Sequence, residues 1–217
     1  MKKKIFMGGF FVGLLMVLAV SAYAIPYGFY NITNNSGIAS TIAGQFIVDV
    51  ISDPFGAKFT FSNVGPTASF IAQIYFDDGP PQSLLQLVNV VNGPGGVSFA
   101  QGGTPANLPS QNTATPAFVT TPGFLATANN PAPQKGVNVG EFVSIIFSLN
   151  GKTFSDVIND MNTGNLRAGI HVQGIGTSDA SDSFVSQGPS QVPVPESGML
   201  ILLGAGLLGL MAVRKRN

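Results

Sequence analysis

The sequence predicts an all-β protein whose main part is a single antiparallel β-sandwich, jelly-roll-like, with a short helix and a long irregular loop. Three observations carry this prediction. Several short runs alternate apolar and polar residues between Gly, Pro, Asn or Asp. The chain of 217 residues has 17 Phe, no Trp and no Cys, so phenylalanine fills the core. An apolar segment at each end predicts an N-terminal signal helix and a C-terminal transmembrane helix.

Five runs show the period-two alternation of a half-buried strand. They cover residues 45–51, 58–62, 70–76, 142–150 and 166–174. In the third run, the alternation predicts that Phe70, Ala72, Ile74 and Phe76 share one face. Short strands joined by polar turns are typical of a sandwich or a barrel, and we expect a sandwich over residues 25–185.

One segment departs from the strand pattern. Between Thr153 and Gly164 the sequence predicts a short helix that Ser155 caps and Gly164 ends. Its apolar side comprises Val157, Ile158 and Met161.

The stretch 93–139 has seven Pro, seven Gly and a single charged residue, Lys135. Such a composition with little periodicity predicts an irregular surface loop. Three apolar clusters, at 97–99, 118–119 and 124–125, are expected to anchor it to the core.

Residues 1–24 have the layout of a cleavable secretion signal. A lysine triplet precedes an apolar run over residues 5–20, and Ala22 and Ala24 form the Ala-x-Ala pattern that signal peptidase reads. We expect the export machinery and signal peptidase as partners, with cleavage after Ala24. An uncleaved anchor helix is the alternative, and it also exports the rest of the chain.

The C-terminal end has three parts. Residues 186–198 form a Pro/Ser/Gly-rich linker, and residues 199–217 hold an apolar helix followed by Arg214, Lys215 and Arg216. The 15 apolar or glycine residues 199–213 make a helix of about 22 Å, short of the ~30 Å hydrocarbon core. The basic residues act as a membrane stop and stay cytoplasmic by the positive-inside tendency, leaving the domain outside.

Within this end, Val194, Pro195, Glu196 and Ser197 precede the apolar helix and the basic stop. The three parts together resemble the PEP-CTERM sorting tail of exported proteins from Gram-negative bacteria that make extracellular polysaccharide. The resemblance implies an exosortase, a membrane enzyme, as the partner that cleaves the tail. The family has a second proline where this chain has Ser197. The body also resembles exported domains that carry this tail, at residues 59–63, 74–79, 166–173 and 181–185.

Charge excludes one class of partner. Residues 25–195 carry four basic and nine acidic residues, a net charge of −5. A nucleic acid needs a basic surface to displace its counterions, so we expect no nucleic-acid partner. The partners we expect are the membrane, through the C-terminal helix, and extracellular polysaccharide.

Few residues are candidates for chemistry. His171 is the only histidine, so any Ser-His-acid triad must use it, but no Gly-x-Ser-x-Gly turn accompanies it. Asp77, Asp78, Asp179 and Asp182 lie in two turns, where they either serve as turn residues or bind calcium. We favour turn residues, and we predict no catalytic, cofactor-binding or metal-binding residue and no cofactor.

Three functional classes remain. We predict a non-catalytic cell-surface or extracellular-matrix protein associated with exopolysaccharide or biofilm, anchored in the inner membrane as a precursor and then placed at the outer surface or outside the cell. The first alternative is a carbohydrate-binding module, which usually needs exposed aromatic rings; the exported part has only Tyr27, Tyr30 and Tyr75 besides phenylalanine. The second is an extracellular hydrolase.

Overall fold

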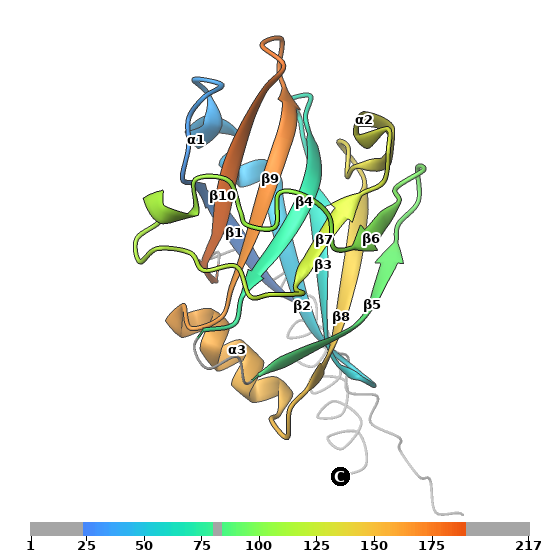
Figure 1. The fold of residues 1–217 in the computed structure, drawn as a ribbon, viewed down its shortest axis with the longest axis vertical. Helices are drawn as coiled ribbons and strands as arrows, with labels where there is room; N and C mark the ends of the chain where they lie inside the picture. Colours follow the sequence, from blue (N-terminus) through green and yellow to red (C-terminus); the bar gives the residue numbers. More distant parts are fainter. Residues whose placement is uncertain (1–23, 80–83, 190–217) are drawn as a thin grey trace, which may run out of the picture.

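Ten strands of the described residues form one continuous antiparallel sheet that curls into a nearly closed barrel (Figure 1). The computed structural model describes residues 24–79 and 84–189. The strands are β1 (Ile25–Asn31), β2 (Phe46–Asp53), β3 (Gly56–Asn63), β4 (Phe70–Asp77), β5 (Leu85–Asn92), β6 (Phe99–Gln101), β7 (Leu125–Ala128), β8 (Phe142–Leu149), β9 (Arg167–Ile175) and β10 (Ala180–Pro189). Their order across the sheet is β5-β8-β3-β2-β1-β10-β9-β4-β7-β6.

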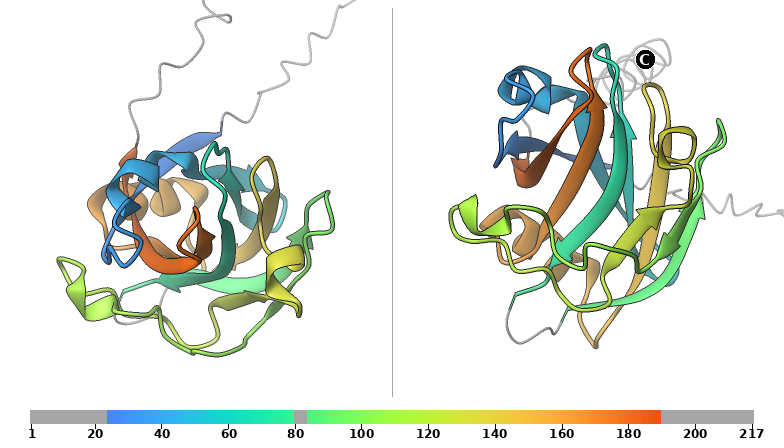
Figure 2. Two further views of the ribbon diagram at one scale, coloured as in Figure 1. Left: turned by 90° about the horizontal axis from the view of Figure 1, so that it is seen from above. Right: turned by 45° about the horizontal axis from the view of Figure 1, so that its top comes forward.

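Short helical elements accompany the sheet: α1 (Ala39–Ile42), α2 (Ala132–Lys135), α3 (Phe154–Thr163) and the 3-10 turns η1 (Ala43–Gln45) and η2 (Gln111–Thr113). The views in Figure 2 show the sheet curling around on itself. Helix α3 lies at one end of the barrel (Figure 1), and its Val157 and Met161 join the core.

The antiparallel all-β fold is confirmed, but the jelly-roll-like sandwich is corrected to one coiled sheet. Alternation requires only that each strand bury one face, and two stacked sheets or one curled sheet meet that requirement equally well. Register shifts interrupt the pairing of β1, β4, β5 and β10. Such irregularities bend strands and increase their twist, which favours a sheet that closes on itself.

Phenylalanine rings fill the interior of the barrel. Phe76 on β4 makes edge contacts with Phe59, Phe61 and Phe147, at centroid distances of 5.2, 5.8 and 4.8 Å. Phe147 also meets Phe124 at 5.2 Å. All of these rings except Phe124 are at most 1% exposed. The interior is therefore a packed core, as expected for a small barrel.

The predicted facing of β4 is wrong at its start. Ile71, Ile74 and Phe76 join the main core, whereas Phe70 and Ala72 are buried outside it. A register shift between Ile71 and Gln73 changes which side chains point inward. An extra residue in one strand reverses the alternation beyond it, and a sequence pattern does not reveal where that residue lies.

Helix α3 confirms the predicted short helix with a different cap. Thr153 caps it: its hydroxyl accepts a hydrogen bond from the Asp156 backbone N–H, and its own backbone N–H donates to the Asp156 carboxylate. This reciprocal arrangement is a capping box, which leaves Ser155 inside the helix. Gly164 ends the helix at a φ of 78°, as expected of a glycine at that position.

The stretch 93–139 is more ordered than predicted, because it contains β6, η2, β7 and α2. Each expected anchor contributes buried side chains: Val97 and Phe99, Phe118, and Phe124 and Leu125. Val119, also expected to anchor the stretch, is instead 61% exposed. Residues 102–124, which we call the outer strap, cross the outer face of β10, β9 and β4 (Figure 1). A second apolar cluster lies there, formed by Tyr75, Leu108, Ala114, Phe118, Leu125 and Val185.

Several predicted features fall outside the described residues. These are the signal helix up to residue 23, with Ala22, and the tail with Val194, Pro195, Glu196, Ser197, Arg214, Lys215 and Arg216. Among the residues that the structure does describe, no helix has the length and apolar character needed to cross a membrane. Residues 186–189, expected in the linker, continue β10 instead.

Candidate functional site

The chain enters and leaves the barrel at the same end. Strand β1 begins at Ile25 and β10 ends at Pro189, and the two strands pair antiparallel with Tyr27 opposite Pro189. Segments that precede residue 25 and follow residue 189 therefore emerge from neighbouring strands.

The expected cleavage site adjoins the sheet directly. Ala24 is exposed, and Ile25, the next residue, already pairs with Val50 of β2. A protease that reads an extended segment across the 24–25 bond needs Ile25 free of this pairing. We therefore expect cleavage after Ala24 to precede the pairing of β1, as it does when a chain is exported unfolded.

The tyrosines that a sugar-binding face would use are largely buried. Tyr27 and Tyr75 are fully enclosed, and Tyr30 is partly buried. The Tyr27 hydroxyl donates to Asn162 Oδ1 of α3 at 2.9 Å, and burial raises the pKa of Tyr27 to about 12. The Tyr75 hydroxyl donates to the Pro105 carbonyl of the outer strap, and burial raises its pKa further. These two rings hold α3 and the strap in place.

A buried ion pair fixes the outer strap to the sheet. Asp77 ends β4 and lies opposite Arg167, the first residue of β9. The guanidinium pairs with the Asp77 carboxylate and donates to the Pro116 and Ala117 carbonyls at 2.7 and 2.6 Å. It also lies 5.4 Å from the centre of the Phe118 ring. Arg167 thus satisfies both the carboxylate and the strap carbonyls, so its charge is used structurally.

The acidic residues considered for calcium are spread over separate structural roles. Asp77 pairs with Arg167, and the Asp78 carboxylate accepts from the Leu84 and Leu85 backbone N–H groups. Asp179 is exposed in a turn with φ 51°. In the two described ranges, no three His, Asp or Glu residues gather as a metal site would require.

Asp182 lies on β10 and not in the turn predicted for it, and it organises the segment before α1. Its carboxylate accepts hydrogen bonds from the Thr33 hydroxyl at 2.8 Å and from the Asn35 and Ser36 backbone N–H groups at 2.6 and 3.1 Å. Desolvation by burial raises the pKa of Asp182, but these hydrogen bonds outweigh it and hold the pKa below its ordinary value. The residue acts as a capping acceptor for a turn.

His171 lies on the outer face of β9, beside Gln173. Its Nδ1 is 3.0 Å from Gln73 Oε1 and 3.4 Å from Gln173 Nε2. Gln73 Nε2 donates to the Thr104 carbonyl of the outer strap, so its Oε1 faces His171 and accepts a hydrogen bond from Nδ1–H. Burial lowers the pKa of His171, with Asp182 opposing the shift. The Gln73 amide thus links His171 of β9 to the outer strap.

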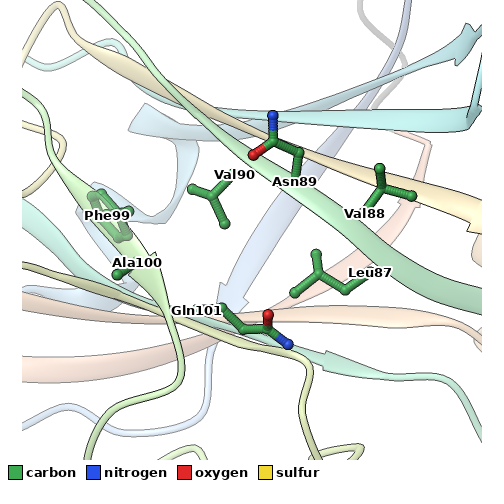
Figure 3. Close-up of a pocket in the computed structure, with 7 residues that line it drawn as sticks. All are labelled: Leu87, Val88, Asn89, Val90, Phe99, Ala100 and Gln101. Carbon is green, nitrogen blue, oxygen red and sulfur yellow. The ribbon is translucent and has the colours of Figure 1, made fainter.

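A hollow lies between the two terminal strands of the sheet, where the barrel does not close. It has a volume of about 240 Å³. Its lining comes from β5 and β6: Leu87, Val88, Asn89, Val90, Phe99, Ala100 and Gln101 (Figure 3). The Phe99 backbone N–H donates to Asn92 Oδ1 at 2.7 Å, which holds β6 to the end of β5. These seven lining residues include no acid, base or nucleophile.

Sequence reasoning did not predict β5 or β6. The run LQLVNVVN at 85–92 contains a register shift between Leu87 and Asn89, which breaks strict alternation. Its signal is the concentration of Val and Leu without any charge, which favours a strand even without regular spacing.

The chain carries a known sorting signal at its end. Residues 191–216 match the family model of the PEP-CTERM protein-sorting motif. The motif identifies an exosortase substrate, an exported protein that is anchored transiently in the membrane before processing. One residue separates its first position from Pro189, the last residue of β10. No curated protein and no solved structure matches the chain.

Proposed function

We propose that the protein is a non-catalytic component of the cell surface or extracellular matrix, associated with exopolysaccharide or biofilm. The barrel is the functional domain, and the C-terminal tail is the sorting signal. The observation that carries the proposal is the sorting motif at residues 191–216, which begins two residues after β10 ends at Pro189.

The positions of the chain ends support this arrangement. The Lys residues at 2–4 and the basic residues at 214–216 are both expected to stay cytoplasmic. The barrel between them then lies on the outer side, with Ile25 and Pro189 at its membrane-facing end. Neither end of the domain has to cross the barrel to reach the membrane.

A non-catalytic role is supported by how the polar groups are used. His171 is held by glutamine amides, Asp77 pairs with Arg167, and Asp182 holds a turn. The barrel interior is filled by phenylalanine rings, which leaves binding to the outer surface. A binding module needs a stable scaffold more than a reactive group, and this chain provides that scaffold.

Cell fractionation tests the sorting part of the proposal. The full chain and a variant lacking residues 199–213 are expressed in a host with exosortase, beside the control Ser190→Thr, which lies outside the matched motif. We expect to find the full chain and the control at the surface or in the medium. We expect the deletion variant to be detached from the membrane but not sorted to the surface. Equal distribution of the full chain and the deletion variant would overturn the proposal.

A second comparison tests the association with polysaccharide. The processed protein is followed in the same host with and without its exopolysaccharide synthesis. We expect retention at the surface in the first case and release into the medium in the second. Equal retention would contradict the association with polysaccharide and leave the sorting result intact.

A further inference from the structure

Strand β5 has one free edge. In the described sheet it is the terminal strand and pairs with β8 alone. The hollow lies between β5 and β6, the other terminal strand, and the described residues form no strand pairing between these two strands. Monomeric proteins usually protect such an edge with Lys, Pro or a covering segment.

This edge carries none of the usual protective residues. The sequence of β5, LQLVNVVN, has no charge and no proline. The whole stretch 79–134, which includes β5, β6 and β7, contains no Asp, Glu, Lys, Arg or His. A segment of high β-propensity and low charge favours pairing with a like segment.

Charge makes a second copy of this chain the fitting partner. The exported part carries a net charge of −5, so two copies repel each other when their charged surfaces approach. The neutral stretch that forms the β5 edge lets two copies meet without placing like charges together. An acidic or basic partner would find no complementary charge on β5.

The outer face next to this edge is also self-complementary. Val88 and Val91 on β5 are 45% and 41% exposed, and Phe142 on the neighbouring β8 is 40% exposed. Asn89 and Gln86 lie opposite Ile146 and Ser148 of β8. Valine packs against valine across paired strands, and amide side chains donate to and accept from their own kind.

We propose that β5 pairs antiparallel with β5 of a second copy, so that two barrels join through one continuous sheet. The contact is isologous, because the same strand contributes from each copy. The inference concerns the barrel alone and goes beyond the proposed function. It holds whether or not the tail is processed.

Cysteine cross-linking in cells tests the pairing on the full chain. The protein has no cysteine, so a single introduced thiol reports one position without background. Variants Val88→Cys, Asn89→Cys and Val91→Cys are oxidised in the membrane, beside the control Val64→Cys, a position 56% exposed outside the sheet. We expect disulfide-linked dimers from at least one β5 position, because residues near a two-fold axis face their own copies. The control should remain monomeric.

An edge lysine separates specific pairing from chance collision. Val91→Lys combined with Asn89→Cys places two like charges at the joint, and we expect the dimer to fall at least tenfold. Val64→Lys combined with Asn89→Cys should leave it unchanged. Equal cross-linking at residues 64 and 89, no dimer at any β5 position, or an adduct with a different protein in place of the dimer would overturn the proposal. Far-UV circular dichroism of each purified full chain checks that both lysine variants remain folded.

Discussion

Arg167 and Asp77 are opposite one another on β9 and β4, and their side chains form an ion pair beneath Phe118 of the outer strap. Both side chains are about nine-tenths buried. The pair therefore joins two neighbouring strands and an irregular segment from elsewhere in the chain. It explains how a proline-rich stretch with few regular hydrogen bonds keeps a defined position on the sheet.

Removing one charge of this pair should destabilise the protein strongly. Asp77→Asn leaves the buried Arg167 without its counter-charge, and we expect a loss of about 3–5 kcal/mol in the free energy of unfolding. Urea unfolding of the exported protein measures it. The control Asp179→Asn changes an exposed turn residue and should alter stability by less than about 0.5 kcal/mol. Equal effects of the two substitutions would show that the ion pair does not hold the strap.

The aromatic core gives a second matched pair of substitutions. Phe76→Ala removes a ring that contacts three others, and we expect a loss of about 3–5 kcal/mol from lost burial and the cavity left behind. Phe55→Ala removes a ring that is 64% exposed, and its effect should be small. Thermal unfolding followed by circular dichroism compares them. If Phe76→Ala destabilised the protein no more than Phe55→Ala, the barrel interior would not be packed as described.

Gly169 tests the close approach of the outer strap to β9. A Cβ at this position would lie 2.8 Å from Leu108 Cδ2 and 3.0 Å from Phe118 Cζ. Gly169→Ala should therefore cost about 1–3 kcal/mol as the strap is pushed outward. Gly44→Ala meets no atom within 4 Å and has no positive φ, so it should be neutral or slightly stabilising. Limited proteolysis within residues 102–124 should rise for the first variant only.

His171 should make stability depend on pH in the mildly acidic range. Burial lowers its folded pKa below the ordinary 6.5, so the unfolded chain binds the proton more readily. Its contribution is complete above pH 6.5 and is lost as the pH falls through the lower folded pKa. The variant His171→Asn keeps an amide donor toward Gln73, and its stability should change less between pH 7 and pH 5. An equal loss of stability in both proteins would contradict this assignment. Asp182 does not account for the effect, because its pKa lies below its ordinary value of 3.8.

The strands with regular alternation were predictable, because each buries one face. Phe59 and Phe61 of β3 and Val143 and Ile145 of β8 point inward as their spacing predicts. The facing of the first residues of β4 was not predictable. The register shift after Ile71 is set by the pairing of β4 with β9 and leaves no mark in the sequence. Local spacing reports the face of a strand, whereas its partners depend on contacts far along the chain.

The candidate sites also divide into those that the sequence predicted and those that depend on the fold. The sorting motif is a contiguous signal, and the residues around Glu196 were recognisable from their order alone. The Asp77–Arg167 pair joins residues 90 positions apart, and the free edge of β5 exists only because the sheet ends there. Both depend on strand order, which a single sequence leaves open.

Intact mass spectrometry of the protein recovered from the cell surface or medium tests the central claim most directly. The account predicts a chain that begins at Ile25 and ends between residues 191 and 198, before the apolar run at 199–213. Recovery there of a chain that still ends at Asn217, in a host whose exosortase cleaves other substrates, would contradict it.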